Sequence, residues 1–91
     1  MSENSPKPAA NAIPASIQLD TSGLHCPEPV MLLHQAIRKS QSGQIIHVVA
    51  TDPSTLRDIP KFCLHLGHEL LMQQQQQHNG KVQYLFDIRK K

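Results

Sequence analysis

A cysteine at the predicted start of a helix is the residue with the clearest capacity for chemistry. Cys26 lies within Gly23 to Val30 (GLHCPEPV) and is followed by Pro27, which suits the first position of a helix because that position needs no backbone N–H bond. Thiols at helix N-termini can have their pKa lowered from about 8.5 into the range of about 3.5 to 7.5. We therefore expect a moderately lowered pKa for Cys26 and a nucleophilic thiolate near neutral pH. On the local sequence alone, an unreactive cysteine at a helix start is an equal alternative.

The neighbours of Cys26 modify this expectation. A protonated His25 would add positive charge beside the thiol, whereas Glu28 opposes ionisation. Pro29 should stiffen the first helical turn and leave Cys26 on an ordered, exposed corner. Such a sulfur could attack one partner's sulfur and then be attacked by the next partner's thiol, as in disulfide exchange.

The other potential ligands and thiols favour simpler interpretations. Cys63 shares a predicted helical face with Leu56, Ile59 and Leu66, which predicts a small buried hydrophobic residue. The alternative is a resolving thiol that pairs with Cys26 as a redox switch. The six histidines and two cysteines match no compact zinc spacing, so we expect no metal site.

The elements that must position Cys26 follow from periodicity and turn signals. Apolar patterns predict strands at about 17–20, 44–51, 69–76 and 82–88, with a helix over about 27–41 and a second helix after an Asp-Pro-Ser capping signal. Pro60 predicts that the second helix is kinked or begins late, and Leu70 and Met72 are expected to face the core. His78, Asn79 and Gly80 predict a hairpin turn. The order βαβαββ predicts an α/β chain of the two-layer α+β type, a four-stranded mixed sheet with both helices on one face.

Composition sets the size and class of the protein. Residues 1–15 are rich in Pro, Ala, Asn and Ser and are expected to form a disordered tail, with one domain over 16–91. Nine Lys or Arg face seven Asp or Glu, but three of the nine end the chain, which leaves six against seven in its body. With two Phe, one Tyr and no Trp, the chain lacks the usual surface of a nucleic-acid binder. The absence of a signal peptide or a long apolar segment predicts a cytoplasmic protein that does not enter a membrane.

Two motifs resemble one family. Gly23 to Met31 (GLHCPEPVM) is similar to the Cys-Pro-x-Pro signature of the TusA sulfur-carrier family. Asp52 to Cys63 (DPSTLRDIPKFC) also resembles the TusA proteins of transfer-RNA thiolation, and the similarity extends from Ile17 to Lys91. His25 and His34 stand where the family usually has basic residues, which bears on partner affinity more than on the chemistry.

The resemblance implies a relay. A cysteine desulfurase would pass persulfide sulfur to Cys26, supported by His25, Pro27, Glu28 and Pro29, and a downstream sulfur-relay protein would receive it for 2-thiolation of the transfer-RNA wobble uridine. This is a sulfurtransferase-type carrier that needs no organic cofactor and no direct nucleic-acid contact, and whether to count it as an enzyme stays open.

The resemblance also implies docking residues for the partners, namely Met31, Asp52, Arg57 and Asp58. A lone surface methionine and a solvated helix start explain the same residues equally well. Relatives with the same motif serve sulfur oxidation or molybdenum cofactor synthesis, and a non-catalytic binding or regulatory module is a further alternative.

Overall fold

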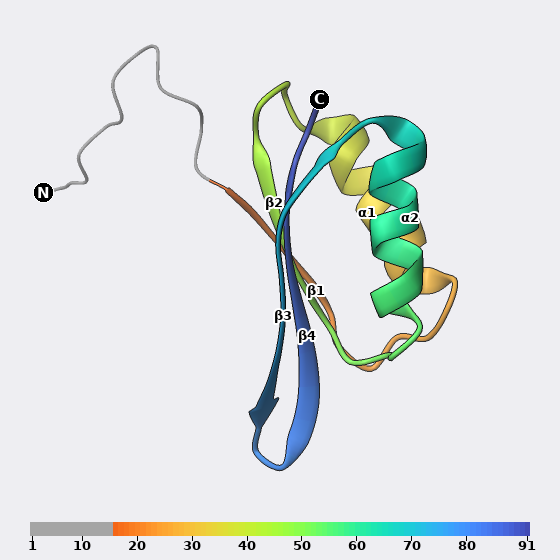
Figure 1. Cartoon of the computed structure of the whole chain (residues 1–91), viewed down its shortest axis with the longest axis vertical. Helices are drawn as coiled ribbons and strands as arrows, with labels where there is room; N and C mark the ends of the chain where they lie inside the picture. Colours follow the sequence, from red (N-terminus) through yellow and green to blue (C-terminus); the bar gives the residue numbers. More distant parts are fainter. Residues whose placement is uncertain (1–15) are drawn as a thin grey trace, which may run out of the picture.

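A parallel pair of strands opens the part of the chain that the computed structural model describes, residues 16–91. β1 (Ile17–Thr21) pairs with β2 (Ile45–Ala50), with Ile17 opposite Ile46 and Thr21 opposite Ala50. Two parallel neighbours need a crossover connection, and α1 (Glu28–Lys39) supplies it. Figure 1 shows α1 and α2 together on one face of the sheet.

The second half of the chain completes the sheet. α2 (Thr55–Leu66) leads from β2 to β3 (Glu69–His78), which turns back into β4 (Lys81–Arg89). β4 pairs antiparallel with both β2 and β3, so the sheet order is β1-β2-β4-β3. Asn79 and Gly80 form the turn with φ angles of 53° and 77°, the backbone that a two-residue hairpin requires. The predicted order βαβαββ, the mixed sheet and the single helical layer are confirmed.

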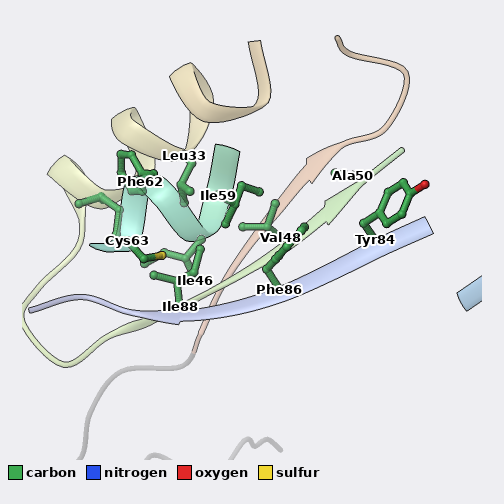
Figure 2. Close-up of a cluster of buried hydrophobic side chains, with 11 residues drawn as sticks. Leu33, Ile46, Val48, Ala50, Ile59, Phe62, Cys63, Tyr84, Phe86 and Ile88 are labelled. Atoms are coloured by element: carbon green, nitrogen blue, oxygen red, sulfur yellow. The ribbon is translucent and has the colours of Figure 1, made fainter. Parts of the chain in front are cut away.

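The core lies between the sheet and the two helices. Every second residue of β2 and β4 faces the helices, and α1 and α2 each contribute one apolar stripe (Figure 2). Leu33 is the fully buried centre of the α1 stripe. The remaining buried apolar residues are Ile37, Ile46, Val48, Ala50, Ile59, Phe62, Cys63, Tyr84, Phe86 and Ile88.

Two local expectations are wrong. The buried stripe of α2 consists of Thr55, Ile59, Phe62 and Cys63, whereas the two outer leucines of the predicted face are largely exposed. The helix turns its Phe62 side inward because the large aromatic ring removes more apolar surface from water. α2 also begins at Thr55 and contains Pro60, so it does not begin late.

The second error concerns β3. The register shifts between Leu70 and Met72, so that Leu70 pairs with the inward-facing Ile88 while Met72 pairs with Asp87 on the open face of the sheet. A bulge adds one residue to a strand and reverses the alternation beyond it. Met72 therefore faces away from the core.

Two further expectations touch the limits of the described chain. The predicted tail, residues 1–15, lies outside the described residues. Among residues 16–91, no helix has the length and apolar character that crossing a membrane would need.

Candidate functional site

The loops after β1 and β2 meet at one end of the sheet. Because the two strands are parallel neighbours, β1 and β2 both end at the same end of the sheet. Each strand is followed by a loop and then by a helix (Figure 1). The Gly23 N–H donates a hydrogen bond to Thr51 Oγ1 at 2.8 Å, which joins the loops directly. Gly23 has a φ of 81°, a backbone conformation that glycine adopts without strain.

Asp52 fixes the backbone of Cys26. The Cys26 N–H donates to Asp52 Oδ2 at 2.7 Å, and the Ser54 hydroxyl donates to the same oxygen at 2.7 Å. These hydrogen bonds, with that of Ser54 the largest contribution, hold the pKa of Asp52 below its ordinary value. The ionised carboxylate thus ties the segment before α1 to the start of α2.

The start of α1 presents Cys26 at the surface. The helix begins at Glu28, Pro27 stands just before it, and Pro29 lies in its first turn with its ring buried. The prediction that Pro27 is the first helical residue is therefore off by one position. The peptide bond between Cys26 and Pro27 is cis. Cys26 itself is exposed, as predicted.

The sulfur of Cys26 contacts a carboxylate in the first turn of α2. Cys26 Sγ donates to Asp58 Oδ2 at 3.2 Å, while Arg57 Nε donates to the other oxygen, Asp58 Oδ1, at 3.1 Å. The bond to Asp58, with a smaller desolvation effect, raises the pKa of the Cys26 thiol above its ordinary value. The same bond lowers the pKa of Asp58. The predicted lowering of the Cys26 pKa is therefore wrong, because the thiol donates to a carboxylate 32 residues away in the sequence.

Two shallow grooves flank Cys26. One, of about 200 Å³, is lined by Leu24, Glu28, Met31, Leu32 and Gln35. The other, of about 270 Å³, is lined by Pro27, Val30, Asp58, Lys61, Phe62 and His65. The Met31 side chain is 54% exposed, as expected for a residue off the buried stripe of α1. Cys26 lines neither groove, but residues next to it in the sequence, Leu24 and Glu28 in one and Pro27 in the other, do.

The structure brings most of the predicted site residues to one place. Asp52 and Asp58 both contact Cys26, and Arg57 joins through Asp58. His25 and Glu28 are exposed beside them, and the charge of His25 acts on Asp52.

Sequence reasoning missed the role of one residue. The Ser54 hydroxyl, whose hydrogen bond goes to Asp52 Oδ2, acts to lower the Cys26 pKa, against the effect of Asp58. The sequence identifies Ser54 only as a helix-start residue. Ser54 follows β2, and β2 is parallel to β1, the strand that leads to Cys26. This position could have revealed that Ser54 lies near the thiol.

Cys63 occupies the core, as predicted. Its side chain is 2% exposed, points from α2 toward the sheet, and forms no disulfide (Figure 2). Burial raises the pKa of the Cys63 thiol to about 11. A thiol that is neutral and enclosed is poorly suited to resolve a disulfide with Cys26, so the redox-switch alternative loses its support.

Comparisons with known proteins agree with the two sequence motifs. The family described as "Sulfurtransferase TusA" matches residues 17–88. A relative from Pseudomonas entomophila named "Sulfur carrier protein TusA" is 58% identical over 73 residues, which cover 80% of this chain and 86% of the relative. A protein of the same name from Pseudomonas paraeruginosa is 54% identical over 78 residues, covering 86% of this chain and 94% of the relative.

A solved structure resembles the fold. The crystal structure of a SirA-like protein from Desulfitobacterium hafniense superposes with a TM-score of 0.62 at 17% identity, over 82% of this chain and 99% of that one. At this identity the likeness concerns the fold alone. The family match and the high identity to curated relatives go further: this chain belongs to the TusA family.

Proposed function

We propose that this chain is a sulfur carrier that accepts sulfur from a cysteine desulfurase as a persulfide on Cys26 and passes it to a downstream relay protein. The observation that carries the proposal is the position of Cys26, the exposed one of the two cysteines, on a corner that two helix starts and Asp52 hold in place. Relatives that are 58% identical to this chain over 73 residues and 54% identical over 78 residues are named sulfur carrier proteins.

The chemistry is a thiol exchange that needs no added oxidant. The Cys26 thiolate attacks the outer sulfur of the donor's persulfide, a new S–S bond forms at Cys26, and the donor's S–S bond breaks. The donor cysteine leaves as a thiolate, and the proton released from Cys26 balances its charge. A second thiol then attacks the outer sulfur on Cys26 and leaves Cys26 as a thiolate again.

The surroundings of Cys26 support transfer between proteins. Within residues 16–91 Cys26 is exposed, so a docked partner can approach its sulfur directly. Met31 offers an exposed apolar contact on one side, and Asp52, Arg57 and Asp58 offer charged groups on the other. We assign these four residues to partner docking.

Loading can be tested by mass. After incubation with a cysteine desulfurase and cysteine, the protein should gain about 32 Da, the mass of one sulfur atom. Cys26→Ser should abolish the gain, whereas Cys63→Ala, a matched change at the buried cysteine, should retain it. No gain in the wild type, or an undiminished gain in Cys26→Ser, would refute the proposal.

The segment from Asp52 to Cys63 is similar to transfer-RNA thiolation proteins. This similarity supports one pathway, the 2-thiolation of the wobble uridine of transfer RNA in the cytoplasm. Cells that carry Cys26→Ala as their only copy should lack 2-thiouridine, measured by mass spectrometry of digested transfer RNA, while Cys63→Ala cells keep it. Normal 2-thiouridine in Cys26→Ala cells would instead indicate a non-catalytic binding module or another sulfur pathway.

A further inference from the structure

Two polar side chains of opposite hydrogen-bonding character lie near the sulfur of Cys26. Asp58 offers a carboxylate oxygen, which can only accept a hydrogen bond, and Sγ donates to it at 3.2 Å. Ser54 offers a hydroxyl, which donates to the same oxygen, Asp52 Oδ2, as the Cys26 N–H and which can donate to an anionic sulfur instead. A neutral thiol and a thiolate therefore select different partners.

We propose that Asp58 and Ser54 are positioning residues for two alternative states of Cys26: the Asp58 carboxylate holds the sulfur as a protonated thiol at rest, and the Ser54 hydroxyl holds it as an anion. This inference rests on the proposed function, because the anion is the form that attacks a persulfide. It adds that the Cys26 thiol of the resting carrier is held protonated and is not a thiolate at all times.

The geometry keeps Asp58 in the accepting state. Arg57 donates to Asp58 Oδ1 at 3.1 Å, and the charge of Lys61 also favours the carboxylate. The carboxyl group lies in the first turn of α2, next to the fully buried Ile59, so the helix cannot easily carry it away from the sulfur. A carboxylate in this position stabilises S–H and repels S⁻.

Ser54 can act only when its hydroxyl turns. At rest, its one hydroxyl proton is donated to Asp52 Oδ2 at 2.7 Å, and the side chain forms no capping bond with α2. One proton serves one strong acceptor at a time, so a thiolate must compete with Asp52 for it. The loss of the Cys26 proton thus exchanges the bond with Asp58 for a bond from Ser54.

The other charges around the sulfur act indirectly. Arg57 favours the thiolate by its charge, and His25 acts on Asp52. Glu28 is the first residue of α1 and lies beside the site. Within residues 16–91, the hydrogen bond of Cys26 Sγ goes to Asp58 and not to Glu28. It follows that a guanidinium or ammonium group that binds Asp58 Oδ2 would free the sulfur, so a cationic side chain of a docked protein could start the transfer.

The experiment is the pH profile of Cys26 alkylation by iodoacetamide, followed by intact mass without any sulfur donor. Asp58→Asn should lower the midpoint of the profile and also its high-pH plateau. If the midpoint falls by about one pH unit, alkylation at pH 7 should rise by about threefold, because the thiolate fraction rises about tenfold while nucleophilicity falls. Ser54→Ala should move the midpoint in the opposite direction.

Glu28→Gln is the matched control, since it removes a nearby carboxylate that does not bond the sulfur, and it should shift the midpoint less than Asp58→Asn. If Asp58→Asn does not fold by circular dichroism, Asp58→Ser tests the same idea, again with a lowered midpoint. An unshifted midpoint in the Asp58 or Ser54 variant overturns the inference. If this inference is wrong, the alkylation profiles do not shift but the protein still gains sulfur from a cysteine desulfurase. If the proposed function is wrong, the protein gains no sulfur, whereas the alkylation profiles still shift as described.

Discussion

At the scale of single residues, the site depends on contacts between the Cys26 segment and the segment that enters α2. The Cys26 thiol donates to Asp58 in the first turn of α2, and the Cys26 N–H donates to Asp52 in the loop before α2. The sulfur is exposed and yet restrained. This combination suits a carrier that must wait for its partners without reacting on the way.

The two cysteines should differ in reactivity. In the folded protein, iodoacetamide should modify Cys26 and leave Cys63 unmodified, because Cys63 is enclosed in the core and its thiol has a pKa of about 11. Peptide mass mapping after brief alkylation measures both sites. In urea the two should react at similar rates. Modification of Cys63 in the native state would contradict the structure.

Asp52 should contribute to stability in a pH-dependent way. Its pKa in the folded protein lies below the ordinary 3.8, so its contribution is present above that value and is lost as the pH falls through the folded pKa. Asp52→Asn should therefore lower the free energy of unfolding at pH 7 more than at pH 3, as urea titrations at the two pH values would measure. An equal difference at both would show that the Asp52 charge is not involved.

The residues of the site were more predictable than their interactions. Cys26, Asp52, Arg57 and Asp58 stand out from the sequence as a reactive thiol and a charged helix start. The bond between Cys26 and Asp58 joins residues 32 positions apart, and only the parallel pairing of β1 and β2 brings them together. For this reason the sequence predicted the wrong direction for the thiol pKa.

At the scale of elements, the helices are held by their apolar stripes. Leu33 of α1 is fully buried, whereas Leu64 of α2 is 80% exposed. Leu33→Ala should reduce the free energy of unfolding by about 2–5 kcal/mol, because it leaves a cavity in the core. The same substitution at Leu64 should change it by less than about 0.5 kcal/mol. Urea unfolding measures both, and comparable losses would contradict the assigned stripes.

Periodicity predicted the type and order of every element within residues 16–91 but not all the faces. Alternation identified β4 and the β-branched run identified β2, since both patterns arise directly from burial on a sheet. The bulge near Leu71 reversed the face of Met72, and Phe62 shifted the stripe of α2. Both depend on packing between distant segments, which a local pattern does not contain.

At the scale of the whole molecule, the hydrophobic core and the candidate site occupy different parts of the fold. One modest core fills the space between the sheet and the helices (Figure 2), and Cys26 is exposed at the surface outside that core. A domain of this size buries too little of its surface to enclose a reaction. If the protein carries sulfur as proposed, we expect the transfer to take place at an interface with another protein.

Release of sulfur from the loaded protein is the sharpest test of Cys26 as a carrier. The protein is loaded by a cysteine desulfurase, separated from it, and mixed with an excess of a small thiol, while intact mass is followed over time. We expect the added mass of about 32 Da to disappear as the thiol takes up the sulfur, and Cys63→Ala to behave in the same way. Added sulfur that stays on the protein, or that resides on a residue other than Cys26, would rule out a carrier role for this thiol.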